Sequence, residues 1–386
     1  MKTKRMLVIP GGFLPYNDTV TLLTYKRLRC LDYKFDVIAF KGKEDLGIKQ
    51  ELEKDPNYKK FDVEYLCNYD DAIAIKKPYK LPISIINMVR YVRMGLHKFE
   101  NNKYDCIFTS SIPGISHIVG YKIKKKYPSI KWYASFSDPI KNSPYKKDPD
   151  LKLRNPFYRF AFNVGSFIYM NNKYEEVAIK KADNLIFICE EQRDFTIAQY
   201  SNREELLKKS IIMPLTYIPE WNMYKNLMNA DKVNNHPRQA VHLGRLYGLR
   251  KIDNFLEALK ELKEEMPDLS SKIIFHQYSE IQPYDLEKIR KFNLEDVFKV
   301  HKKVSYEESI EIMKHADILV LFDTIMTGED IQPYLPSKIT EYLLLNKPIL
   351  GICESNSPSY RILNENGYNL NSNEIKKIKE NIIKLL

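Results

Sequence analysis

The sequence predicts two α/β domains, each built on a parallel sheet with helices on both faces. The chain has 386 residues, which exceeds one ordinary domain and is enough for two separate cores. Short apolar runs alternate with stretches of helical spacing, the pattern of parallel sheets. The alternation pauses in a stretch marked by Pro and Asn, and then starts again. We therefore expect two doubly wound sheets that face a central cleft.

Ten apolar runs predict the strands. The first half contains RMLVIPGG, FDVIAFKG, YDCIFTSS, KWYASFSD and NLIFICEE, and the second half contains QAVHLGRL, KIIFHQYS, VFKVHKKV, ADILVLFDT and KPILGICES. These runs place an N-terminal domain at 1–215, a linker at 216–237 and a C-terminal domain at 238–372. Residues 373–386 predict an amphipathic helix, with Ile375, Ile378, Ile382 and Leu385 on one face. We expect this helix to pack back on the first domain.

The composition is that of an ordinary globular protein, with 44% hydrophobic and 29% charged residues. The five cysteines are scattered and form no C-x-x-C pair, which favours a reducing compartment and argues against a disulfide framework. The first apolar run, Met6 to Ile9, is too short for a signal sequence or a membrane span. We expect a cytoplasmic protein.

Positive charge is concentrated in the first half of the chain. Residues 1–190 carry 34 Lys and Arg against 21 Asp and Glu, whereas residues 191–386 carry 27 against 29. Such a charge attracts nucleic acid, an anionic membrane surface or a phosphate-bearing substrate. No nucleic-acid motif accompanies it, so no nucleic-acid partner is expected.

Two segments of the first half combine basic and apolar or aromatic residues: INMVRYVRMGLHKFENNKY and NPFYRFAFNVGSFIYMNNKY. They suit an anionic membrane surface, which would make the protein peripheral on the inner face of the cell membrane. Alternatively the apolar residues are core and the charges are solvated. The sequence leaves both readings open.

The stretch YLPSKITEYLLLNKPILGI contains the most specific pattern. Pro336 stops any preceding helix, and Ser337 is a favourable cap for a helix that begins there. The free N–H groups at such a start suit a diphosphate. Glu341 lies one turn further on, where a carboxylate can accept hydrogen bonds from the two ribose hydroxyls. The plainer alternative is that Ser337 only caps the helix and Glu341 only complements its dipole.

A second pattern, AVHLGRLYGLRKIDNFLEALKEL, is a strand, a basic loop and a helix. Gly244 allows the backbone to approach a ligand closely, and Arg245 with Arg250 or Lys251 supplies positive charge for a leaving diphosphate. A basic loop of this kind is also common on α/β domains without such a role.

Together these stretches resemble the family 4 retaining glycosyltransferases, in which PSK-x-x-EY, an apolar helix and KPIL recur. The resemblance implies a GT-B fold, Glu341 on the nucleotide ribose, and Ser337 and Lys338 near the diphosphate. The basic loop after Gly244 is also similar to the family's G-R-L-x-x-x-K-G-x-D pattern. Arg250 stands at the lysine position and Lys251 at the glycine position. The family's second glutamate, eight residues before the first, is Pro333 here. Either Glu329 or Asp330 is expected to contact the donor sugar in its place.

The resemblance also indicates residues of the first domain. It places the loop of Gly11 and Gly12, after the first strand, beside the donor phosphates and the acceptor. Asp138 follows a strand where many relatives carry a His-Asp pair, so it is the candidate to orient the acceptor or donor at the reacting carbon; an Asp that starts a Pro turn is the alternative. Glu190, at another strand end, is expected to line the cleft. The candidate catalytic residues are thus Asp138, Arg245 and Arg250.

No metal site is expected. Asp148-Pro149-Asp150 spells the D-x-D of metal-dependent transferases, but it lies in a polar loop instead of ending an apolar strand. The seven histidines show no zinc-binding spacing. We expect no cofactor, because the nucleotide sugar is a substrate.

The function expected from the resemblance is transfer of a sugar, with retention and without metal, from a nucleotide-diphosphate donor, by family frequency a UDP-sugar. The expected acceptor is a glycan or a polyprenyl-linked sugar in cell-surface polysaccharide synthesis. Two alternatives stay open: a catalytically silent partner that stabilises an active transferase, and a sugar-nucleotide epimerase. The first would not hydrolyse donor, and the second would convert donor without an acceptor.

Overall fold

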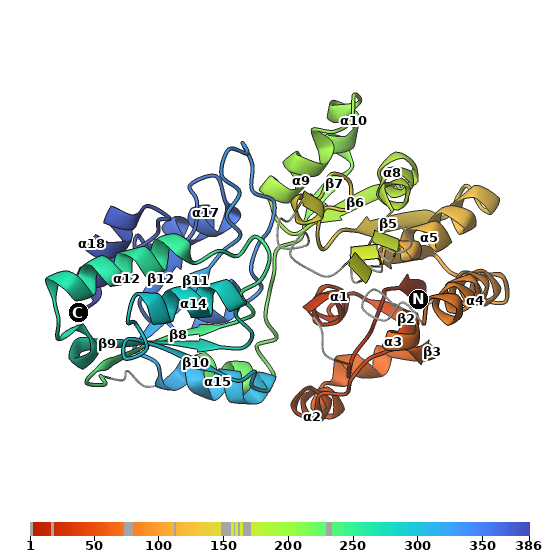
Figure 1. Ribbon diagram of the computed structural model, residues 1–386. Coiled ribbons are helices and arrows are strands. Elements are labelled where there is room, and N and C mark those ends of the chain that lie inside the picture. Colours follow the sequence, from red (N-terminus) through yellow and green to blue (C-terminus); the bar gives the residue numbers. More distant parts are fainter. Residues whose placement is uncertain are drawn as a thin grey trace. The chain divides into compact units, whose positions relative to one another are not determined.

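The structure is a computed structural model that describes residues 3–16, 19–72, 80–111, 113–147, 156–157, 159–160, 163–164, 171–228 and 234–386. The chain divides into two compact units, Met1–Thr216 and Tyr217–Leu386. Each unit contains one parallel sheet with helices packed around it (Figure 1). The predicted α/β fold class, with two doubly wound sheets, is confirmed.

The first unit contains a seven-stranded parallel sheet of order β3-β2-β1-β4-β5-β6-β7. Its strands are β1 (Lys4–Ile9), β2 (Tyr33–Lys41), β3 (Phe61–Asn68), β4 (Cys106–Ser110), β5 (Lys131–Ser135), β6 (Asn184–Phe187) and β7 (Ser210–Ile212). Its helices are α1 (Thr19–Leu28), α2 (Leu46–Lys54), η1 (Pro56–Lys60), α3 (Tyr69–Ala72), α4 (Leu81–Glu100), α5 (Ile115–Lys126), η3 (Pro144–Lys147), α8 (Asn172–Lys181), α9 (Glu190–Ile197) and α10 (Arg203–Lys208).

The second unit contains a five-stranded parallel sheet of order β10-β9-β8-β11-β12. Its strands are β8 (Arg238–Leu243), β9 (Ile273–Tyr278), β10 (Phe298–His301), β11 (Ile318–Phe322) and β12 (Ile349–Ile352). Its helices are α11 (Asn222–Met228), α12 (Asp253–Glu265), α13 (Leu269–Lys272), α14 (Pro283–Lys291), α15 (Tyr306–His315), α16 (Ile339–Leu344), α17 (Pro358–Glu365) and α18 (Ile375–Leu385).

All ten predicted strands are present, and two further strands were missed. Strand β3 lies at an edge of its sheet, and its side chains are mostly exposed or half-buried. Strand β7 lies at the other edge and has three residues. Neither sequence contains the long apolar run that marks a strand buried on both faces.

The C-terminal helix does not pack as we expected from the sequence. Ile378, Ile382 and Leu385 of α18 are buried in the core of the second unit, in one cluster with Phe255 and Leu259 of α12. Helices α12 and α18 lie side by side (Figure 1). The amphipathic pattern correctly predicted one buried face, but it does not say which core that face meets.

The predicted linker contains a structured segment. Helix α11 falls within residues 216–237, with Trp221 1% exposed and Tyr224 fully buried. The Tyr224 hydroxyl lies 2.9 Å from that of Tyr306 on α15. These residues therefore belong to the second unit and do not form a free connection.

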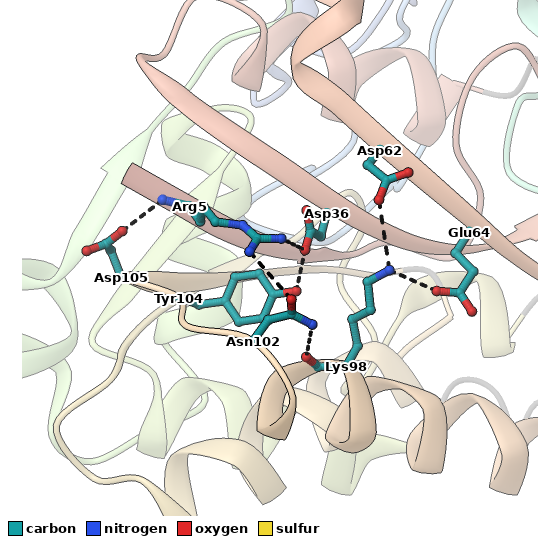
Figure 2. Close-up of polar contacts among 8 residues, drawn as sticks. All are labelled: Arg5, Asp36, Asp62, Glu64, Lys98, Asn102, Tyr104 and Asp105. Atoms are coloured by element: carbon teal, nitrogen blue, oxygen red, sulfur yellow. Dashed lines mark hydrogen bonds and ion pairs between the residues drawn. The ribbon is translucent and has the colours of Figure 1, made fainter. Parts of the chain in front are cut away.

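A polar network joins strands β1 and β2 to the residues just before β4 (Figure 2). Asp36 of β2, which is 4% exposed, accepts hydrogen bonds from Arg5 of β1 and from the Tyr104 hydroxyl, both at 2.5 Å. Arg5 also donates its backbone N–H to Asp105, just before β4. Arg5 and Asp105 lie at the amino ends of their strands, opposite the carboxyl ends where ligands of parallel sheets bind. We assign this network to the fold.

Among the described residues, no helix is both long and apolar enough to cross a membrane. In the same residues, no group of three or more His, Cys, Asp or Glu side chains is placed to hold a metal ion. The D-x-D sequence Asp148-Pro149-Asp150 lies outside the described residues, as does most of the aromatic segment near Phe160.

Candidate functional site

The basic loop after β8 is held in place by its backbone and carries two arginines around one tyrosine. The Leu246 N–H donates to the Glu280 carbonyl, and the Leu249 carbonyl accepts from Ile325, both at 2.9 Å. The guanidinium carbons of Arg245 and Arg250 lie 5.1 and 5.7 Å from the centre of the Tyr247 ring. Such contacts hold both cations at the same ring. The structure thus gathers two of the predicted donor-binding residues, with Lys251 half-buried next in the chain.

Gly244 packs against His242, a residue that no motif indicated. His242 of β8 is 4% exposed, and its Nδ1 lies 2.9 Å from the Val320 carbonyl. Since a carbonyl only accepts, Nδ1 carries the proton and Nε2 presents a lone pair. That Nε2 is buried and has no hydrogen-bond partner. A Cβ atom on residue 244 would come within 3.1 Å of it, so close packing on His242 also favours glycine here.

His242 stays neutral. Burial lowers the pKa of its imidazole to about 3, and the charges of Arg250 and Lys338 lower it further in the same direction. The Leu243 N–H, at the end of β8, donates to the Tyr342 hydroxyl of α16 at 3.4 Å, so β8 and α16 meet at this point. The histidine adds no charge to a site that is already positive.

The start of helix α16 differs from the prediction. The helix begins at Ile339, and Lys338 stands at its N-cap without any side-chain capping bond. Lys338 has helical dihedral angles, whereas a side chain that caps needs an extended backbone. The chain enters through tight turns, with Ile339 donating to the Pro336 carbonyl at 3.2 Å and Thr340 to that of Ser337 at 3.4 Å. The prediction that Ser337 caps the helix is therefore wrong.

Glu341 is the buried carboxylate of the site, at 4% exposure. Its Oε1 accepts a hydrogen bond from the Tyr306 hydroxyl at 2.6 Å, and its Oε2 is buried without a partner. Burial and the charge of Glu341 raise the pKa of Tyr306 well above its usual value, so this hydroxyl remains a donor. Since its one proton goes to Glu341, the Tyr224 hydroxyl donates to Tyr306. One carboxylate oxygen is thus fixed and the other can accept.

Lys338 lies beside the same tyrosine. Its Nζ is 4.5 Å from the centre of the Tyr306 ring and 3.3 Å from the Ser309 hydroxyl oxygen. Burial lowers the pKa of this ammonium group, and the charge of Glu341 opposes that shift. A cation and a carboxylate, each with unused hydrogen-bonding capacity, thus share the first turn of α16.

A second buried carboxylate, Asp323, follows β11 directly and was not selected from the sequence. It is fully buried; its Oδ1 accepts from the Thr324 N–H at 2.7 Å and from the Gln332 amide at 2.9 Å. Among the described residues, its buried Oδ2 has no hydrogen-bond partner of good geometry. Burial raises the pKa of Asp323 to about 6, and the Ser359 hydroxyl, the Thr324 N–H and the charge of Arg250 oppose this shift. The signal in the sequence was an Asp at the end of an all-apolar strand, in the run ILVLFD.

Glu329 and Asp330 are exposed at the tip of the loop between β11 and α16. The loop is anchored at its sides, where the Met326 N–H donates to Glu354 at 2.6 Å and the Asn356 amide to the Glu329 carbonyl at 2.7 Å. In the described part of the chain, no hydrogen bond or ion pair holds either loop carboxylate. The residue at the expected glutamate position, Pro333, is buried and directly follows Gln332, which holds Asp323.

The predicted residues of the first unit lie at carboxyl ends of its strands. Gly11 and Gly12 follow β1; the Gly11 carbonyl accepts from Phe40 at 2.9 Å. Asp138 is half-buried three residues after β5, and Glu190 is exposed at the start of α9. The sheet therefore places all four at the edge where ligands of parallel sheets bind.

The comparisons with known proteins agree with this geometry. The family described as "Glycosyl transferases group 1" matches residues 224–386. The second unit is therefore similar to the group 1 glycosyl transferases. No curated protein matches the chain.

Solved GT-B glycosyltransferases have the same fold as the whole chain. Alr3699/HepE of Anabaena, in complex with UDP and glucose, is 15% identical with a TM-score of 0.59, over 99% of this chain and 89% of that one. TarM of S. aureus, in complex with fondaparinux, alpha-GlcNAc-glycerol and UDP, is 12% identical with a TM-score of 0.57, over 99% and 92%. Sucrose-phosphate synthase of Thermosynechococcus elongatus is 12% identical with a TM-score of 0.55, over 99% and 94%. At such identities the likeness establishes the fold, and the chain has the GT-B fold.

Proposed function

We propose that this chain is a glycosyltransferase and that it binds a nucleotide-diphosphate sugar, a UDP-sugar in our expectation, at the carboxyl ends of β8, β11 and β12. The observation that carries the proposal is the buried Oε2 of Glu341, which has no hydrogen-bond partner in the described residues and shares Tyr306 with the cation of Lys338. The charges of Lys338 and Arg250 both act on the nearby His242. A carboxylate oxygen without a donor suits the hydroxyls of a ribose, and the cations suit the diphosphate. The similar HepE and TarM structures hold UDP, which supports this donor.

The chemistry proposed for the site is electrostatic. As the bond between the sugar and the diphosphate breaks, negative charge develops on the leaving group, and fixed cations stabilise that charge. Arg250, Lys338 and the more exposed Arg245 supply three such charges without a metal ion. His242 and protonated Tyr306 add none, so the site keeps its positive balance. We propose transfer with retention, by the resemblance of the donor-binding stretches, with Asp138 orienting the reactants.

Calorimetric titration with UDP tests the donor site. We expect saturable binding to the wild type and a loss of about tenfold or more in Glu341→Ala and Arg250→Ala, because each removes a charged hydrogen-bond partner. Glu365→Ala is a matched control, since in the described part of the chain this exposed carboxylate of α17 pairs with Arg361 on its own helix. Equal affinity in all four proteins would refute the assignment. Turnover that persists in the presence of EDTA is expected if no metal takes part.

We further propose that the acceptor is a glycan or lipid-linked sugar and that the first unit meets an anionic membrane surface through α4. Ile83, Ile86 and Val89 of this helix are 48%, 56% and 46% exposed, although they are apolar. Arg90 and Arg93 are exposed on the same side, four and seven residues after Ile86. Helices that lie in a membrane interface combine these two features: their apolar residues insert into the bilayer, and their neighbouring cations contact the lipid phosphates.

Sedimentation with vesicles tests the membrane surface. We expect the protein to bind vesicles that contain phosphatidylglycerol, and to bind those of phosphatidylcholine alone much more weakly. Ile86→Asp should abolish the binding. Leu46→Asp should leave it intact, since Leu46 is 69% exposed at the start of α2, outside the surface on α4. Binding that Ile86→Asp leaves unchanged would refute this role of α4.

A further inference from the structure

The first unit buries an arginine that no acidic group accompanies. Arg27, in the last turn of α1, is 6% exposed. One terminal nitrogen donates to the Ser135 hydroxyl at 2.8 Å and the other to the Met213 carbonyl at 2.6 Å. Its Nε is buried and has no hydrogen-bond partner among the described residues. A guanidinium has five N–H donors, so most of them remain unused here.

The charge of Arg27 is uncompensated. No carboxylate in the described residues forms an ion pair with it, and both of its acceptors are neutral. Burial alone lowers the pKa of the guanidinium to about 9. Arg29, two residues further and similarly buried, pairs with Asp55 at 3.3 Å. Buried charges are normally paired, and of these two neighbouring arginines only Arg29 follows that rule.

The surroundings of Arg27 are hydroxyl-bearing side chains at carboxyl ends of strands. Ser135 ends β5, and its carbonyl accepts from the N–H of Ser111, which directly follows β4. Ser137 donates its hydroxyl to the Ser111 carbonyl at 2.8 Å. All three serines are buried, at 8% exposure or less, and the next residue is Asp138. This is the edge of the first sheet at which we expect the acceptor.

We propose that Arg27, with the hydroxyls of Ser111 and Ser135, binds a phosphate group of the acceptor. Guanidinium N–H groups and serine hydroxyls are donors that phosphate oxygens accept in proteins, and a phosphate supplies the missing negative charge. The inference rests on the proposed transferase function, which it narrows from acceptors in general to acceptors that bear phosphate. A sugar phosphate and a lipid-linked diphosphate share this chemistry.

Nuclear magnetic resonance of the Arg27 Nε–H group tests the proposal in the full chain labelled with ¹⁵N-arginine. The signal is assigned by its absence from Arg27→Lys. On titration with inorganic phosphate at constant ionic strength, we expect a saturable shift of this signal. Arg290→Gln should show the same shift, because this exposed cation lies on α14 of the other unit. A signal that does not move with phosphate or pyrophosphate would overturn the proposal.

Variants that keep the arginine provide the second measurement. Ser135→Ala removes one hydroxyl donor, and we expect it to bind phosphate about tenfold more weakly. Arg203→Gln, an exposed cation of α10, is the matched control and should bind as the wild type does. Equal phosphate affinity in Ser135→Ala and the wild type would count against the site. These titrations need no donor and no turnover, so their failure leaves the donor site standing, and the reverse also holds.

Competition identifies the source of the phosphate. A soluble sugar phosphate and a polyprenyl diphosphate sugar in micelles are added separately, and the Nε–H signal is followed. Displacement of inorganic phosphate by either one supports the site and names its ligand class. If only a phosphate-free glycan perturbs the signal, the proposal is wrong.

Discussion

Asp323 gives the sharpest stability prediction, because its charge is buried and one of its oxygens has no partner. Burial raises the pKa of the folded-state carboxyl from 3.8 to about 6. The charged form is therefore disfavoured in the folded protein at neutral pH, by about 3 kcal/mol. Asp323→Asn removes the charge and keeps an oxygen for Thr324 and Gln332. We expect the variant to be more stable at pH 7, by at most about 3 kcal/mol, because burial of its new amide N–H groups costs part of this gain.

The sign of the effect depends on pH. The pKa of Asp323 is higher in the folded protein than in the unfolded chain. Below pH 3.8 the carboxyl is protonated in both states and costs no stability, and the free energy of unfolding falls as the pH rises through 6. The advantage of Asp323→Asn should thus be large at pH 7 and small near pH 4. The chain has two tryptophans, Trp132 in the first unit and Trp221 in the second, both buried. In a Trp132→Phe background, urea unfolding followed by fluorescence reports the second unit alone.

Equal or lower stability of Asp323→Asn at pH 7 would refute the reasoning, as would an advantage that does not change between pH 7 and pH 4. Reduced transfer by a more stable variant would show that the buried charge is kept for function, since stability and activity often oppose each other at active sites.

Three further predictions concern other parts of the two units. Gly244→Ala should weaken UDP binding because the new Cβ comes close to the His242 ring. His242→Ala in the same chain should restore the UDP affinity, and additive losses of affinity in a double-mutant cycle would contradict this contact. Tyr306→Phe should destabilise the second unit by about 2 kcal/mol in urea unfolding, since it leaves both oxygens of Glu341 without a donor; an unchanged midpoint would count against the contact. Burial lowers the pKa of His117 to about 3 in the folded protein. As the pH drops below 6.5, the imidazole is protonated in the unfolded chain but not in the folded one, so the free energy of unfolding falls. From pH 6.5 to 5 the loss is about 2 kcal/mol, which Trp132 fluorescence should detect and His117→Gln should remove.

The fold could be predicted closely because its strands are buried on both faces. The run ILVLF of β11 is apolar at every position, and such runs mark parallel sheets. The packing of α18 could not be predicted in the same way. Its pattern shows one apolar face, and either domain offered a core for it. Edge strands β3 and β7 escaped because polar or short edge strands lack that pattern.

The sequence indicated the candidate site residues that belong to motifs. It did not indicate those whose surroundings depend on tertiary contacts. Glu341 and Arg250 stand on recognisable spacings. Asp323 and His242 are single residues whose unpaired atoms become evident only when β8, β11 and α16 come together. Ser337 was misjudged because sequence shows a favourable cap residue but not the backbone angles that a cap needs.

The most direct test of the central claim is turnover of a panel of nucleotide sugars. Released nucleotide is measured with and without a membrane extract that supplies acceptors. We expect release from at least one donor, dependent on the extract, and a loss of about 100-fold or more in Glu341→Ala and Arg250→Ala with the fold intact. Conversion of the donor without an acceptor would indicate an epimerase, and no turnover of any donor would favour a silent partner. Near wild-type turnover in either variant would contradict the assignment of the donor site.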